Sequence, residues 1–186
     1  MSVQTRSQLQ ASALTITNET AAGANTASRV GGLFDDLADT ATLNRERGFG
    51  SLTVESNTNF TPTANSAVKL TIAMDEGILS TYNFSLNKST SVITYTGIAG
   101  AALKVSANLT FSASNQREFE WYIAKNGSTI ASSKAGITMS HDNGHAIYFE
   151  AYLTAAVNDE FSVFVKSIDS DQAITIQSLN FTAVTL

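Results

Sequence analysis

Hydrophobic and polar residues alternate along most of the chain after Gly50. The alternation is clearest at residues 103–111 and resumes at residues 119–123, shortly before the dipeptide formed by Asn126 and Gly127. A period of two sends one set of side chains to a core and the other to water, and an Asn-Gly pair readily adopts the positive φ angles of a two-residue hairpin. The pattern therefore predicts half-buried antiparallel β-sheet followed by a tight turn.

Ten segments after residue 50 have the pattern and length of short strands, and turn-forming residues separate them. The predicted strands are residues 52–55, 67–73, 78–86, 92–95, 103–111, 118–125, 128–132, 146–153, 160–168 and 174–184. Helical patterns do not alternate with them, which favours an all-β sandwich or barrel over a parallel α/β fold. In the last strand the apolar positions switch from even to odd numbers near Gln177 and Ser178, so we expect a β-bulge there.

The segment before residue 48 has a different period. Apolar and small residues step by three and four positions along it, which is the spacing of a coiled-coil seam on one face of a helix. The predicted seam consists of Val30, Phe34, Leu37 and Ala41. Gly31 and Gly32 interrupt this helix at a cost of about 2 kcal/mol relative to alanine, which burial of the seam against partner helices in an oligomer would outweigh.

Two other interpretations of this segment stay open. The helix could instead lay its apolar face on the β domain of its own chain, or the glycine pair could end one helix and let another begin at Leu33. Charges and glycines at residues 45–50 indicate a hinge. We therefore expect an arm and an oligomerising helix at residues 1–47 and a β domain at residues 48–186.

Composition and charge argue against several classes of binding partner. The chain has 186 residues, no cysteine and a formal net charge of −5, and its Lys and Arg residues form no basic stripe. The charge pattern therefore argues against a nucleic-acid backbone or an anionic membrane surface as a partner, and the absence of cysteine excludes disulfides and thiolate metal sites. Because no apolar signal segment begins the chain and no long apolar run follows, we expect synthesis in the cytosol and no membrane insertion.

Candidate metal ligands are few. His141 and His145 flank an Asp-Asn-Gly turn, which breaks the helical geometry that a His-x-x-x-His metal site requires. Asp169 and Asp171 lack the loop length and the distant Glu of a dedicated calcium site, so a polar turn is the better interpretation. We predict no metal site.

Candidate catalytic and phosphate-binding patterns also have simpler interpretations. Glu118 and Glu120 share one face of a predicted strand, where we expect a solvated surface rather than the acid and base of a glycosidase. Gly97 and Gly100 do not follow a strand and open a helix, as a phosphate-binding loop requires. We therefore predict no catalytic residue and no cofactor, and we expect that the protein is not an enzyme.

Five aromatic residues divide into two groups. Trp121 and Phe149 share the phase of the apolar positions, which predicts core packing. Tyr122, Tyr148 and Tyr152 fall on the opposite phase and are predicted to face outward. Flat rings of this kind suit either another subunit or a carbohydrate, and we favour the subunit interface.

Motifs of the β domain lie at residues 104–111, 119–123, 125–127 and 157–161, and a closing apolar strand follows. Together they resemble the C1q/TNF-like jelly roll of phage fibre and baseplate proteins. Residues 16–20 and 25–33 are similar to the attachment region of phage tail or head fibres. The resemblance implies a homotrimer around a threefold axis, with N-terminal arms bound to capsid or tail proteins. Asn158 departs from the pattern, because such folds often place Gly before Asp159, but Asn also adopts left-handed conformations.

The resulting hypothesis is a structural virion protein of a tailed bacteriophage. It would be a trimeric head or tail fibre, made in the host cytoplasm and anchored by its N-terminus, with host surface glycans as a candidate ligand. One alternative is a carbohydrate-active enzyme on a jelly-roll scaffold, for which the residues to test are Glu118, Glu120, Asp142 and His145. The other is a purely structural capsid or tail stabiliser. The resemblance names no target, because one fold carries unrelated ligands.

Overall fold

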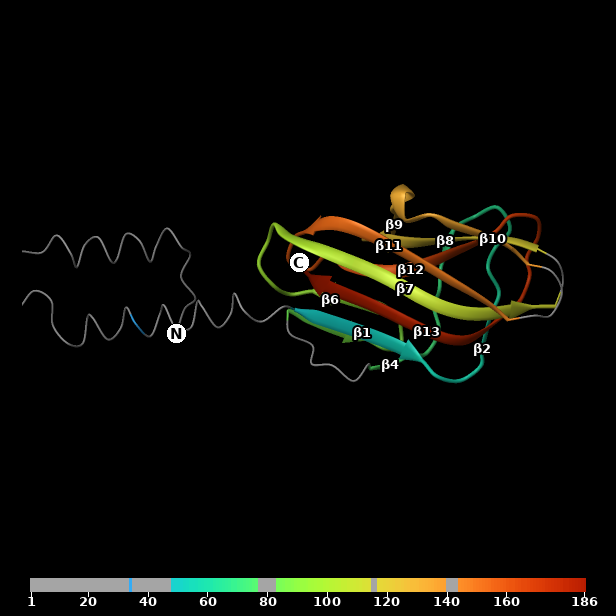
Figure 1. The fold of residues 1–186 in the computed structure, drawn as a ribbon, viewed down its shortest axis with the longest axis horizontal. Helices are drawn as coiled ribbons and strands as arrows, with labels where there is room; N and C mark the ends of the chain where they lie inside the picture. The colour runs from blue at the N-terminus through green and yellow to red at the C-terminus, as the bar shows by residue number, and fades with distance from the viewer. Residues whose placement is uncertain (1–33, 35–47, 77–82, 115–116, 140–143) are drawn as a thin grey trace, which may run out of the picture. The chain divides into compact units, whose positions relative to one another are not determined.

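The computed structural model describes Phe34 and residues 48–76, 83–114, 117–139 and 144–186 (Figure 1). The chain divides into two units between Arg47 and Gly48. The unit Gly48–Leu186 is an all-β sandwich of two sheets. Within its described residues, the one helical element is a short 3-10 helix, Ala131–Ser133. No helix in the described ranges is long and apolar enough to cross a membrane.

Sheet A has the order β11-β7-β13-β1-β4, with β2 beside β13. Its strands are β1 (Phe49–Val54), β2 (Thr58–Phe60), β4 (Asp75–Glu76), β7 (Ala101–Ala113), β11 (His145–Ala155) and β13 (Ile174–Thr185). Sheet B has the order β10-β8-β12-β6-β5, with β3 beside β12 and β9 beside β8. Its strands are β3 (Val68–Lys69), β5 (Phe84–Asn87), β6 (Val92–Tyr95), β8 (Arg117–Lys125), β9 (Ser128–Thr129), β10 (Ala135–Met139) and β12 (Glu160–Ser167). The paired strands of both sheets run antiparallel.

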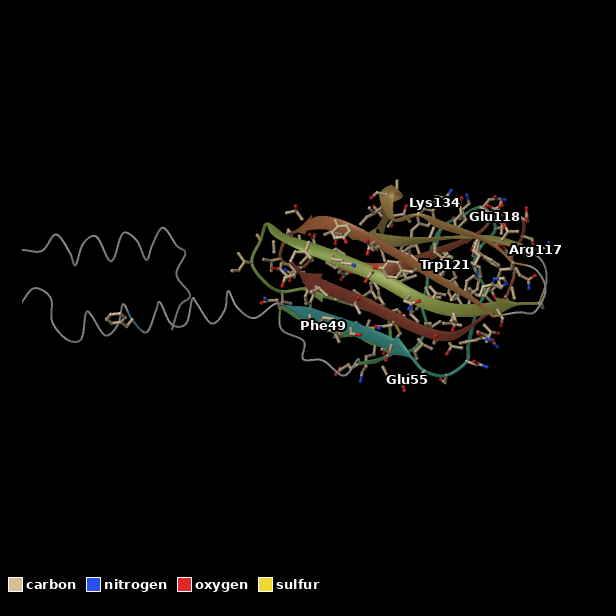
Figure 2. All side chains as sticks on the ribbon, viewed as in Figure 1. Phe49, Glu55, Arg117, Glu118, Trp121 and Lys134 are labelled. Carbon is tan, nitrogen blue, oxygen red and sulfur yellow. The ribbon has the colours of Figure 1, made fainter. Side chains whose placement is uncertain are left out.

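The two clearest predicted alternations meet in the core because β7 and β8 belong to opposite sheets. Every second residue of β7 from Leu103 onward is buried, and the inward side chains of β8 face them. The ring centroid of Phe111 lies 5.7 Å from that of Phe119 and 5.0 Å from that of Trp121, both edge to face. Trp121 and Phe149 are 0% and 4% exposed, which confirms that both belong to the core. Figure 2 shows Trp121 within the sandwich.

Two local features follow the sequence closely. Asn126 and Gly127 have φ angles of 51° and 78°, and β8 and β9 pair directly across them, so the predicted two-residue hairpin is confirmed. In β13 the register against β7 shifts between Ile176 and Ser178, which confirms the predicted bulge. The shift lets the strand bury its apolar residues on both sides of the phase change.

The predicted strand at residues 128–132 is wrong after Thr129. β9 ends there, and the chain enters the 3-10 helix. Ser133 Oγ accepts a hydrogen bond from the Ile123 backbone N–H (2.8 Å) and donates one to the Ile130 carbonyl (2.7 Å), so a buried hydroxyl replaces strand pairing. The following strand, β10, is absent from the sequence-based prediction because it is short and its Gly136 weakens the pattern.

The predicted strand at residues 67–73 is reduced to β3. The segment after β3 still buries Leu70 and Ile72, as the alternation requires. Its backbone hydrogen bonds are irregular, however: Leu70 N–H donates to the Val163 carbonyl (2.8 Å), whereas Ser91 Oγ receives the Ile72 N–H (3.2 Å) and donates to the Ile72 carbonyl (2.6 Å). A side chain therefore takes the place of a neighbouring strand.

Of the predicted trimer seam, Phe34 lies within the described residues. It is helical and 64% exposed. Val30, Leu37 and Ala41 lie outside the described residues, as does residue 33, where a second helix was an alternative. The coiled coil and the trimer therefore stay predictions.

Replacement of Phe111 should measure how far the sandwich depends on its aromatic core. We expect Phe111→Ala to lower the free energy of unfolding by about 3–5 kcal/mol, because it leaves a cavity between Phe119 and Trp121. Ile98 is 70% exposed, and Ile98→Ala is the matched control, with an expected change within about 0.5 kcal/mol. Urea denaturation followed by the fluorescence of the single tryptophan measures both. Equal losses in the two variants would contradict this account of the core.

Candidate functional site

The outward surface of β11, β7, β13 and β1, here called the sheet A face, carries two of the predicted tyrosines. Tyr148 and Tyr152 are 52% and 62% exposed on β11. Hydroxyl and amide groups cover the neighbouring strands and bond across them, as in Ser106 with Thr182 (2.9 Å), Thr110 with Ser178 (2.6 Å) and Ser51 with Asn180 (3.2 Å). The alternation of β7 and β13 produces the polar part of this face, because their inward positions are apolar and most of their outward positions are polar.

One ion pair organises the tyrosines of this face. Lys104 Nζ lies 2.8 Å from Glu150 Oε2, and the Tyr148 hydroxyl donates to the same carboxylate. The Lys104 ammonium also lies 5.9 Å from the ring centroid of Tyr148 and 5.7 Å from that of Tyr152, within cation–π range. The hydrogen bond to Glu150 raises the pKa of Lys104, and the same bond lowers the pKa of Glu150. Both groups therefore stay charged near neutral pH, and both rings are held around one cation.

Tyr122 lies on the opposite side of the sandwich, on the outward surface of sheet B. It is only half buried, and its hydroxyl donates a hydrogen bond to Glu120 Oε2 at 2.7 Å. Burial, together with this bond, raises the pKa of Tyr122 to about 12. The three tyrosines share an outward phase, but the structure brings only Tyr148 and Tyr152 together.

The prediction of a solvated pair at Glu118 and Glu120 is wrong for Glu120. Glu118 is exposed, but Glu120 is 8% exposed and forms ion pairs with Lys134 and, at 3.5 Å, with Lys166. Cross-strand register explains the contact, since Glu120 pairs with Lys166 of β12. The hydrogen bond from Lys134, followed by that from Tyr122, lowers the pKa of Glu120 to about 2. At neutral pH Glu120 therefore carries no proton for a general acid to donate.

A buried carboxylate joins two turns at one end of the sandwich. Asp159 pairs with Lys125 Nζ (2.7 Å) and accepts hydrogen bonds from the Ala156 N–H (2.6 Å) and Asn126 Nδ2 (2.8 Å). Burial raises the pKa of Asp159, but these bonds, that from Lys125 first, outweigh burial, and the pKa is lowered overall. Asn158 has a φ of 69°, the left-handed conformation expected of Asn in this turn. We call these contacts the turn clasp, and sequence analysis did not identify it.

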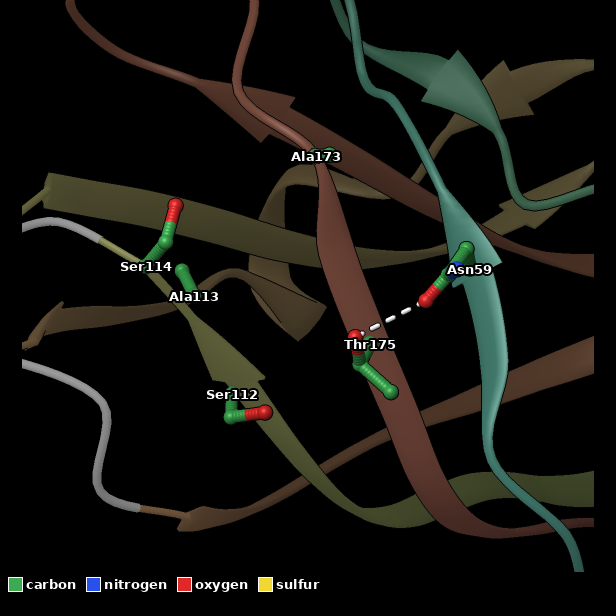
Figure 3. Close-up of a pocket in the computed structure, with 6 residues that line it drawn as sticks. All are labelled: Asn59, Ser112, Ala113, Ser114, Ala173 and Thr175. Carbon is green, nitrogen blue, oxygen red and sulfur yellow. Dashed lines mark hydrogen bonds between the residues drawn. The ribbon is translucent and has the colours of Figure 1, made fainter.

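A hollow of about 370 Å³ lies where β2 meets the end of β7 and the start of β13 (Figure 3). Its lining residues are Asn59, Ser112, Ala113, Ser114, Ala173 and Thr175. Thr175 Oγ1 donates a hydrogen bond to Asn59 Oδ1 at 2.8 Å. The lining offers hydroxyl and amide groups but no titratable side chain, so the hollow provides hydrogen bonding without an acid or base.

The remaining sequence candidates do not converge. In the described part of the chain, no group of three or more His, Asp or Glu side chains could hold a metal ion. Asp171 Oδ1 accepts a hydrogen bond from the Ala64 N–H at 2.6 Å, as a polar turn does. His145 begins β11, whereas His141 and Asp142 lie outside the described residues.

Comparison with known proteins identifies the fold. No protein-family model matches this sequence, and no curated protein does. Among solved structures, Eiger TNF from S. frugiperda is similar with a TM-score of 0.54 and 9% sequence identity, over 76% of this chain and 94% of that one. Murine APRIL is similar with a TM-score of 0.52 and 7% identity, over 74% and 99%. The β domain is a TNF-like jelly roll.

The TNF-like jelly roll confirms the coarser part of the sequence resemblance, which is the fold. Identities this low show the fold alone. The phage resemblance of the N-terminal segment therefore stays a proposal.

The charge of Glu120 should make stability depend on pH. Its folded-state pKa of about 2 lies below its ordinary value of 4.5, so its contribution is present above pH 4.5 and is lost as the pH falls towards 2. We expect Glu120→Gln to lose about 1–3 kcal/mol of unfolding free energy at pH 7. The difference in unfolding free energy between this variant and the wild type should be smaller at about pH 3.

Urea denaturation at both pH values measures this gap. Glu118→Gln is the matched control, because Glu118 is exposed on the same strand and face, and we expect a change within about 0.5 kcal/mol. A gap for Glu120→Gln that is equally wide at the lower pH would show that its charge does not stabilise the fold.

Proposed function

We propose that this protein is a homotrimeric structural protein of a tailed-phage virion, either a head or a tail fibre, and that its TNF-like jelly rolls associate through the sheet A face. The observation that carries the proposal is the exposure of Tyr148 and Tyr152 on a mostly uncharged sheet surface. Exposed aromatic rings on such a surface are typical of protein–protein interfaces.

The preorganisation of this face supports association. Glu150 accepts the Tyr148 hydroxyl and the Lys104 ammonium lies over both rings, which reduces the side-chain freedom to be lost on binding. The surrounding hydroxyl and amide groups bond to one another across strands, which leaves a regular surface for a second copy to cover. The same chain repeated about a threefold axis is what the C1q/TNF resemblance implies.

The role in the virion rests on the N-terminal resemblance. In this proposal residues 1–47 bind capsid or tail proteins and contribute a helical seam, and three distal jelly rolls present any host-binding surface together. Threefold presentation raises avidity through effective concentration without strengthening a single contact. Two observations favour a binding role over turnover: a pKa of about 2 makes Glu120 a poor proton donor and a weak base at neutral pH, and the hollow at Thr175 lacks a titratable side chain.

Light scattering of the full chain tests the assembly. We expect a mass near three times the 19.7 kDa of one chain. Tyr148→Ala combined with Tyr152→Ala should shift the equilibrium towards monomer by at least about tenfold, because truncation of buried aromatic anchors weakens interfaces strongly.

The matched control retains the rings. Tyr148→Phe combined with Tyr152→Phe should stay trimeric, because only the hydroxyl groups are removed. A monomeric wild-type protein would exclude the proposed assembly. A trimer that persists in the double alanine variant would move the interface away from the sheet A face.

A further inference from the structure

The outward surface of sheet B carries a cluster that the proposed assembly does not use. We call it the lysine–aromatic cluster, and it consists of Lys69, Tyr122, Lys134, Phe164 and Lys166 around Glu120. The register places Phe164 of β12 between Tyr122 of β8 and Lys69 of β3, and it places Lys166 opposite Glu120. Residues from three neighbouring strands and the segment after the 3-10 helix thus meet on one surface.

Two half-buried rings form the centre of the cluster. Tyr122 and Phe164 are direct cross-strand partners, so their side chains lie next to each other. The hydrogen bond from the Tyr122 hydroxyl to Glu120 fixes the orientation of one ring. Two neighbouring aromatic rings, one of them restrained, form an apolar surface. A ring-shaped ligand can stack on this surface through the C–H groups on one of its faces.

Three of the chain's six lysines surround this platform. The side chains of Lys134 and Lys166 are 48% and 26% exposed, and each ammonium has more donors than its contact with Glu120 uses. Lys69 has no ion-pair partner in the described part of the chain. With Glu120 counted against the three lysines, the cluster still has a net positive charge, on a chain whose net charge is −5.

Two carboxylates flank the cluster, one at each end. Glu118 on β8 and Glu160 on β12 are exposed and share the outward phase of Glu120 and Phe164. A polyanion with closely spaced charges, such as a nucleic acid, would bring its phosphates against them. A ligand that places one anionic group at the centre and neutral groups on either side avoids this repulsion.

We propose that the lysine–aromatic cluster binds a carboxylated sugar within an anionic polysaccharide. The sugar ring lies on Tyr122 and Phe164, its carboxylate contacts the surrounding lysines, and neutral sugars pass Glu118 and Glu160. The inference rests on the proposed function in one respect, since assembly through the sheet A face leaves three copies of the cluster outside the interface.

Calorimetric titration of the full-length protein tests the proposal. The probe is a hyaluronate hexasaccharide, in which carboxylated and neutral sugars alternate, and chitohexaose is the uncharged probe of equal length. We expect binding of the first only, and Lys69→Glu should weaken it about tenfold because an attraction becomes a repulsion.

The matched control is Lys88→Glu, which makes the same change of charge at an exposed lysine outside the cluster. Its affinity should stay within about twofold of wild type. Thermal unfolding checks that each variant is folded, and Lys69→Gln replaces Lys69→Glu if the latter does not fold.

Four results would overturn the inference. They are no hyaluronate binding by folded wild-type protein, equal affinity for chitohexaose, unchanged affinity in the folded Lys69 variant, and tighter binding of single-stranded DNA of equal charge. Light scattering of the same samples separates this inference from the proposed function. A trimer that does not bind contradicts the inference alone, whereas a monomer that binds and loses affinity on Lys69 substitution contradicts the assembly alone.

Discussion

The structure depends on the contact between the inward face of β7 and that of β8. These strands are consecutive in the chain but lie in different sheets, so the apolar side chains that each directs inward pack in the space between the two sheets. Phe111 lies at the centre of this contact, against Phe119 and Trp121. Once these apolar faces are buried together, the outward positions of both sheets are fixed, and with them the two surfaces on which ligands or subunits could bind.

Sequence patterns predict this sandwich where the information is local. The hairpin at Asn126 and the bulge near Ser178 depend on residues within a few positions of each other, and both are confirmed. The irregular segments depend on distant partners: Ser133 is bound to the backbone of Ile123, and Ile72 to the side chain of Ser91. A single sequence does not reveal which hydroxyl replaces a strand, so strand boundaries were predicted least well in these segments.

The sequence pattern was also insufficient to predict the candidate surfaces in full. The alternation correctly predicts that Tyr148 and Tyr152 point outward. It does not show which of the two sheets a strand belongs to, so Tyr122 was grouped with these two residues although it lies on the other sheet. Nor could it show that Glu120 is buried, because the lysines that hold it come from β12 and from the segment after the 3-10 helix. The two faces consequently differ in chemistry. The sheet A face is mostly neutral and contains one ion pair, whereas the sheet B face concentrates charge around two rings.

The turn clasp has a consequence for folding kinetics. Its hydrogen bonds join residues 33 and 34 positions apart, since Asn126 contacts both Asp159 and the Glu160 N–H. Contacts that require the β8–β9 hairpin to dock on the turn between β11 and β12 are formed late, and interactions absent from the transition state act mainly on the unfolding step. We therefore expect the clasp to prolong the lifetime of the native state while leaving the speed of its formation almost unchanged.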